Sequence, residues 1–369
     1  MIRAIVAALL VASCARAFTF DQRRQSMIDF QANPKVLEAS GYATIAAKLY
    51  NKQDAAWCSK RLQELLGAGP QGDMFWMYPT TAIAYLDRGQ LTVPARKALR
   101  ESWKTYAPYR GDTENHWLLY YTTLYLMSQM YPGESGDTWF TGKSSQENFE
   151  ESKRWIESWV KLTTTRGQGE YDSTHYIGVY MLPISYLAEW AKDPAMKKRA
   201  TMMLDYLIAD YAAENLNGLY AGAHARSYDQ EIIERAATVS SDFGWLLFGL
   251  GHSINGNYAA FYSMARGYEP PEILRRIATD RSQPYTHYER KRTRNRWRFH
   301  DERHGPVYKT TYVRKEYAVG SDQGGILQPI QEHSWDVGRS RRPRCPQYFV
   351  RLKSAFVIVR TRNLLRLRS

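Results

Sequence analysis

Three segments of this chain are apolar on nearly every side, and they constrain the fold more than any other feature. Residues 116–131 and 175–190 carry almost no charge, and residues 74–86 carry none. A helix that is apolar all round has to be surrounded by protein. Each of the three is followed by an amphipathic segment; these segments are 92–106, 144–163 and 193–213. We therefore predict a mainly α fold in which inner and outer helical hairpins form an (α/α) toroid, with a plain helical bundle as the alternative.

The expected outer helices begin with recognisable capping signals. Ser144 is followed three residues later by Glu147, the spacing of a capping box, in which each side chain satisfies a backbone amide of the other. Asp193 precedes Pro194, which suits a helix N-cap followed by proline at the first helical position. These signals predict helix starts near 145 and 194.

The pattern changes near residue 283, where short β-like runs replace the helical segments. Residues 308–313 (YKTTYV) alternate in polarity and lie between glycine-containing turns. We expect a helical domain over 18–282 and the start of a β-rich, sandwich-like domain over 283–337.

The charge of the chain is concentrated at its ends. The net charge is +13, but residues 338–369 hold nine Arg and one Lys without any acid, and Arg3 and Arg16 lie in the leader. The body over 18–337 is therefore almost neutral, which argues against a nucleic-acid partner. We expect the tail at 338–369 to be poorly ordered and to result from a shifted reading frame; the alternative is a basic arm for nucleic acid or anionic lipid.

The leader predicts export. Arg3, an apolar run over 5–12 and a small-x-small site at 15–17 form a signal peptide covering residues 1–17. In the alternative, the segment ending at Cys14 is a lipobox and that cysteine carries a lipid anchor. Either form predicts a secreted or periplasmic protein, and no stretch of the body is long and apolar enough to span a membrane. With two further cysteines, Cys58 and Cys345, the chain offers no disulfide framework.

A polar loop precedes each expected inner helix. These loops are Gln71–Asp73, Asp112–His116 and Glu170–Tyr176. In an alternating ring they fall at the same end of the inner barrel, so we expect their side chains to converge on one mouth.

Common cofactor and metal motifs are absent from the sequence. There is no His-Glu-x-x-His motif, no P-loop, no dinucleotide fingerprint and no Gly-x-Ser-x-Gly elbow. We therefore expect neither a metal nor a cofactor.

The order of polar residues along the loops resembles that of a known superfamily. Asn115, His175, Tyr176 and Arg226, together with the leader and the hairpins, resemble the (α/α)-toroid polysaccharide lyases and the related six-hairpin glycosidases. Residues 317–321 and 328–336 are similar to the segment that enters the β-sandwich in such proteins.

This resemblance implies an enzyme that acts on a uronate-containing polysaccharide by β-elimination. Asn115 and a partner on the acid side would neutralise the carboxylate, His175 or Tyr176 would remove the proton on the adjacent carbon, and Tyr176 would return a proton to the leaving oxygen; Arg226 completes the set. Tyr180, one helical turn later, is an alternative to Tyr176.

The remaining candidates are expected to bind substrate around these four. They are Trp76, Glu114, His116, Trp117, Asp172, Tyr180, His224 and Tyr228. Two alternatives stay open: a glycoside hydrolase that uses Glu114 and Asp172 as its pair of carboxyl groups, and a non-catalytic toroid that binds glycans.

Overall fold

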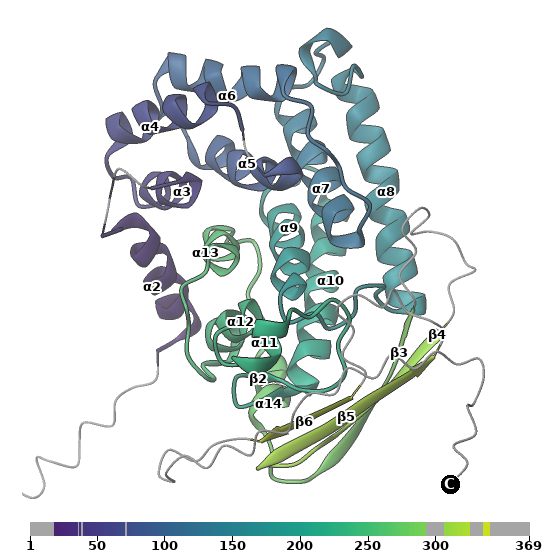
Figure 1. The fold of residues 1–369 in the computed structure, drawn as a ribbon. Helices are drawn as coiled ribbons and strands as arrows, with labels where there is room; N and C mark the ends of the chain where they lie inside the picture. The colour runs from purple at the N-terminus through teal and green to yellow at the C-terminus, as the bar shows by residue number, and fades with distance from the viewer. Residues whose placement is uncertain are drawn as a thin grey trace, which may run out of the picture.

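The computed structural model describes residues 18–35, 37, 40–70, 72–292, 306–324 and 335–339. The leader, Cys14, Cys345 and the tail beyond Arg339 lie outside these residues, as do residues 328–334 of the expected sandwich entry. Within them the chain is mainly helical, with a small antiparallel sheet near its C-terminal end (Figure 1). The mainly α prediction and the β-rich segment after 283 are thereby confirmed.

The helices follow one another from residue 20 to residue 279. They are α2 (Phe20–Ala32), α3 (Tyr42–Tyr50), α4 (Ala55–Gly67), α5 (Met77–Leu86), α6 (Val93–Thr105), α7 (Glu114–Met130), α8 (Ser145–Arg166), α9 (Tyr176–Trp190), α10 (Pro194–Ala213), α11 (Asp229–Ile233), α12 (Val239–Phe248), α13 (Asn257–Met264) and α14 (Glu272–Thr279), with short 3-10 turns at Asp73–Trp76 and Gly136–Thr138.

The three apolar segments form buried helices. In α9 every residue from Tyr176 to Ala188 is buried, and α5 and α7 are buried over most of their length. The amphipathic helices α6, α8 and α10 each bury one face only. The capping box at Ser144 and the Asp193 cap are both present.

Five of the helices contact one another in a closed series. α3 contacts α5, α5 contacts α7, α7 contacts α9, α9 contacts α13, and α13 contacts α3 again. Helices α4, α8 and α10 pack against α3, α7 and α9 respectively. None of the helices among the described residues has both the length and the apolar character that crossing a membrane requires.

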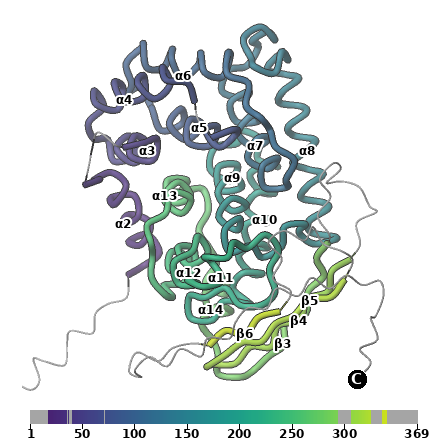
Figure 2. Tube along the Cα trace, viewed as in Figure 1, coloured from purple at the N-terminus to yellow at the C-terminus, as the bar shows by residue number. Residues whose placement is uncertain are grey.

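A four-stranded antiparallel sheet packs beside the C-terminal end of α8 (Figure 2). Its strands lie in chain order: β3 (Tyr285–Arg292), β4 (Pro306–Val313), β5 (Tyr317–Gly324) and β6 (Trp335–Arg339). β6 extends two residues past the boundary expected at 337. A two-stranded hairpin, β1 (Asn215–Leu216) and β2 (Leu219–Tyr220), follows α10.

Candidate functional site

The first turns of five helices meet at one end of the closed series, which we call the mouth. The ring of Tyr258 in α13 lies 5.7 Å from that of Tyr78 in α5 and 5.9 Å from that of His175 before α9. The ring of Phe75 lies 5.3 Å from that of His116 in α7. The start of α3 lies against α5 and α13 around a shared pocket. The first turns of these helices therefore lie close together.

Tyr176 is the first residue of α9, and its hydroxyl is held from two sides. Arg226 Nη2 donates to the Tyr176 hydroxyl at 2.9 Å, and the Tyr228 hydroxyl lies 2.6 Å from it. Burial raises the pKa of Tyr176, the hydrogen bond with Tyr228 raises it further, and the guanidinium of Arg226 opposes the rise only in part. Tyr176 is therefore a protonated hydroxyl with a cation beside it.

His175 precedes Tyr176 and is oriented by a carboxylate. Its Nδ1 lies 3.0 Å from Oε1 of Glu231, while Thr174 Oγ1 donates to the other oxygen of Glu231 at 2.5 Å. An imidazole that donates through Nδ1 keeps the lone pair on Nε2. The side chain of His175 is 29% exposed, so this nitrogen belongs to a group that a ligand can reach.

Asn115 is linked to Arg226 through the carboxylate of Glu170. Its backbone and side-chain nitrogens donate to Glu170 Oε2 at 3.0 and 2.5 Å, and Glu170 Oε1 lies 3.8 Å from Arg226 Nη1. Asn115 and Glu170 are both 0% exposed. The structure thus brings the four residues expected to be catalytic into one region, where Asn115 is buried and is linked to Arg226 only through Glu170.

The loop that carries Arg226 has an unusual backbone. Arg226 adopts φ +62° and Asp172, in the neighbouring loop, φ +51°. A non-glycine residue in this region costs on the order of 1 kcal/mol or more and persists only where its surroundings enforce it. Ser173 Oγ donates to the Arg226 carbonyl at 2.8 Å and ties the two loops together.

Five of the residues expected to bind substrate are buried instead. Their exposures are 5% or less; they are Trp76, Glu114, Asp172, Tyr180 and His224. Trp76 packs edge-on against Trp103, the hydroxyl of Tyr180 donates to Glu114, and His224 Nδ1 lies 2.7 Å from the Asp172 carbonyl. A position in a polar loop or an apolar helix does not indicate whether a side chain is buried as a structural contact or exposed to bind a ligand.

Glu114 and Asp172, the carboxyl pair of the glycosidase alternative, are neutralised inside the protein. Glu114 pairs with Arg292, and Asp172 pairs with Lys291 and Lys309. Since each carboxylate is buried against its cation, neither projects into the mouth, and the arrangement does not favour that alternative.

Two other expected contacts, His116 and Tyr228, lie at the mouth and are half-buried. Trp117 is also half-buried, but its ring lies 6.2 Å from that of Trp155 in the outer helix α8. Trp117 Nε1 donates to the Gly111 carbonyl at 2.9 Å, and the guanidinium of Arg110 lies 4.3 Å from the Trp117 ring centre.

A buried charge cluster between the sheet and the helices was not expected. We call it the lysine–carboxylate cluster; its members are Asp172, Asp210, Glu214, Glu289, Lys291 and Lys309, with His287 beside them. Burial would raise the pKa of Asp172, but the two ammonium groups hold it below its ordinary value.

Carboxylates so close together could ligate a metal ion. Two lysine ammonium groups already lie among them, however, and supply counter-charge where a cation would bind. One signal for the cluster was available in the sequence, because Lys309 shares the inward-facing alternation of Val307, Thr311 and Val313.

Glu231, which orients His175, also escaped sequence reasoning, because it lies in a short helix without any motif.

Comparison with known proteins gives no family: no protein-family model, curated protein or solved structure matches this chain.

Proposed function

We propose that this chain is an exported polysaccharide lyase that cleaves a uronate-containing polymer by β-elimination. The observation that supports it best is the pair of proton-transfer groups on successive residues, His175 and Tyr176. Their rings lie 5.0 Å apart, and each is oriented by its own charged partner, Glu231 for the histidine and Arg226 for the tyrosine.

The proposed reaction begins at the carbon next to the uronate carboxylate. Arg226 binds that carboxylate and stabilises the negative charge that develops when the proton leaves. His175 Nε2 takes the proton, since its lone pair is available while Nδ1 is bound to Glu231.

The electron pair then forms a carbon–carbon double bond and expels the glycosidic oxygen. Tyr176, whose raised pKa keeps it protonated, gives its proton to that oxygen. Transfer of the proton from His175 to the Tyr176 phenolate restores both groups, so no net proton is gained or lost.

We also propose the (α/α) toroid as the architecture. The closed series α3, α5, α7, α9 and α13, with α4, α8 and α10 packed outside, supports it. The shared mouth at the N-terminal ends of the inner helices agrees with this arrangement.

The test is digestion of a panel of acidic polysaccharides, followed by ultraviolet absorbance of the unsaturated uronate and by reducing-end release. We expect both signals to rise together. Reducing ends without absorbance would show hydrolysis, and binding without either signal would show a non-catalytic protein; both overturn the proposal.

Two variants assign the roles. Tyr176→Phe should lower kcat by roughly 10²–10⁴-fold, the range for loss of a general acid. Glu231→Gln should lower kcat less, because it weakens the orientation of His175 without removing the imidazole. Tyr308→Phe, on the exposed face of the sheet, is the matched control and should have no effect.

A further inference from the structure

A pocket of about 440 Å³ opens at the mouth, between α2, α3, α5 and α13. We infer that this pocket binds an uncharged sugar unit of the polymer, adjoining the uronate that Arg226 holds. The inference rests on the proposed function and names its substrate class: a polymer in which uronates alternate with neutral or N-acylated sugars, and not a homopolymer of uronates.

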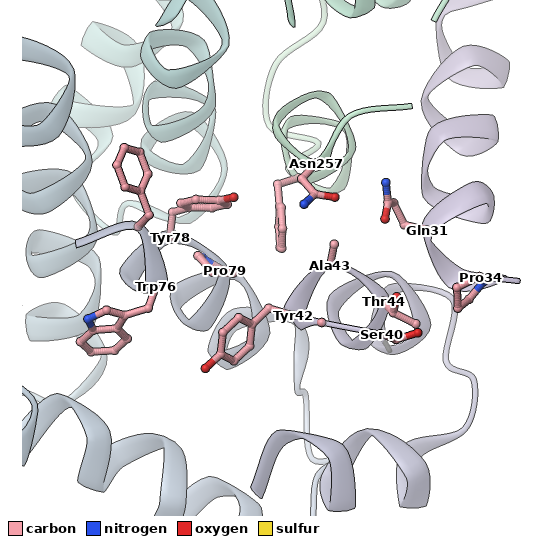
Figure 3. A pocket seen from close by; sticks show the side chains of 13 residues that line it. Gln31, Pro34, Ser40, Tyr42, Ala43, Thr44, Trp76, Tyr78, Pro79 and Asn257 are labelled. Atoms are coloured by element: carbon pink, nitrogen blue, oxygen red, sulfur yellow. The ribbon is translucent and has the colours of Figure 1, made fainter. Parts of the chain in front are cut away.

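The wall of the pocket combines aromatic rings with uncharged hydrogen-bonding groups. Tyr42, Phe75 and Tyr78 supply rings; Gln31, Asn257 and Thr44 supply amides and a hydroxyl. Figure 3 shows the amides of Gln31 and Asn257 approaching the space from α2 and α13, with Tyr78 and Trp76 on the α5 side. Aromatic faces pack against the apolar faces of sugar rings, and amides bond to hydroxyl groups in both directions. The volume falls within the range of small-ligand pockets.

The lining explains the choice between a neutral and an acidic sugar. Among the described lining residues there is no charged side chain. A carboxylate that enters such a pocket loses its hydration without gaining a cation. The weak attraction of helix N-termini for anions does not offset that loss. A sugar that carries only hydroxyl or amide groups incurs no comparable penalty.

The pocket lies near the proposed catalytic pair. Tyr78 lines the pocket, and the ring of Tyr258 lies 5.7 Å from the Tyr78 ring and 5.9 Å from the His175 ring. One polymer chain can therefore place a uronate at Arg226 and the next sugar in the pocket. The arrangement pairs one site that has a cation with a neighbouring site that has none.

The test compares two polymers with the full-length protein: one that alternates uronate with N-acetylhexosamine, and a homopolyuronate of equal length. The decisive variant is Asn257→Arg, which adds a cation at the exposed first residue of α13. Met202→Arg adds the same charge to an exposed position on α10 and serves as the control.

We expect the wild type to cleave the alternating polymer with kcat/KM at least about tenfold higher, as for the loss of one well-matched polar contact. Asn257→Arg should reduce or reverse the ratio of kcat/KM for the alternating polymer to that for the homopolyuronate, and the Met202→Arg control should leave this ratio unchanged. Equal cleavage of both polymers, or a ratio that Asn257→Arg leaves unchanged, overturns the inference.

Calorimetric titration separates this inference from the proposed function. A neutral N-acetylhexosamine oligosaccharide is titrated into Tyr176→Phe and into Tyr176→Phe/Asn257→Arg. Weaker binding by the double variant supports a neutral-sugar pocket even if no polymer is cleaved, in which case the lyase proposal alone fails. Absence of binding to both proteins counts against the pocket.

Discussion

Replacing Glu114 by glutamine tests whether this buried acid is a structural anchor or a catalytic group. Glu114 begins α7 and is 5% exposed. Its carboxylate accepts hydrogen bonds from Trp159 Nε1 at 2.9 Å and from the backbone amide of Gly169 at 2.8 Å, and it pairs with Arg292 of β3. Glutamine preserves the volume but removes the charge.

The expected cost follows from the environment of the remaining partner. The side chain of Arg292 is 2% exposed, and its Nε donates to the Gly167 carbonyl at 2.9 Å. Removing one member of a buried ion pair leaves an uncompensated charge and costs about 3–5 kcal/mol. An exposed pair is worth about 0–1 kcal/mol. Glu64, 45% exposed and 3.0 Å from Arg61, provides that control as Glu64→Gln.

The assay is urea denaturation followed by tryptophan fluorescence and circular dichroism, with the free energy of unfolding taken from each transition. We expect Glu114→Gln to lose about 3–5 kcal/mol. Glu114→Gln/Arg292→Met should lose less than the single variant, because no unpaired charge remains. If the free energy of unfolding of Glu114→Gln lies within about 1 kcal/mol of that of Glu64→Gln while all activity is lost, Glu114 is catalytic and the glycosidase alternative is favoured again.

Two further predictions concern the sheet. Burial lowers the pKa of His287, but the neighbouring carboxylates raise it more, so the folded value lies above 6.5. His287→Gln should therefore cost most stability below about pH 6.5 and least above the raised folded pKa, as measured by chemical denaturation across pH. A loss of stability that grew with pH would contradict this assignment. A Cβ on Gly320 would lie 2.5 Å from the Gly222 Cα, so Gly320→Ala should lower stability by about 1–3 kcal/mol in thermal unfolding. Gly67→Ala, with open space around it, should not, and equal behaviour of the two variants would contradict the close approach.

Local patterns in the sequence sufficed to locate the six helices α5 to α10. The capping box at Ser144 and the proline after Asp193 set the starts of α8 and α10 within one residue, since capping depends on neighbours in the chain. The uniform apolarity of 175–190 likewise indicated a helix enclosed by others. Such signals need no knowledge of distant residues.

Burial of the polar candidates could not be inferred in the same way. Glu114 finds its cation 178 residues further along the chain, and Asp172 finds Lys309 after 137. The sequence around an acidic residue at a helix start does not indicate whether the carboxylate is solvated or paired with a distant arginine. Tyr176 and Arg226 were proposed because their order along the chain resembles that of the toroid lyases, whereas Glu231 had no local signal.

The sheet supports the proposed site without contributing a group to it. The loop before α9 is fixed by Lys309 on Asp172 and by the Tyr171 hydroxyl, which donates to Asp322 of β5 at 2.5 Å. The loop that leads to Arg226 passes so close to β5 that Gly222 and Gly320 meet without room for a side chain. Because the same sheet fixes both loops, the distance between Tyr176 and Arg226 depends on it. The β-rich segment is thus part of the scaffold that sets the geometry of the proposed proton transfer.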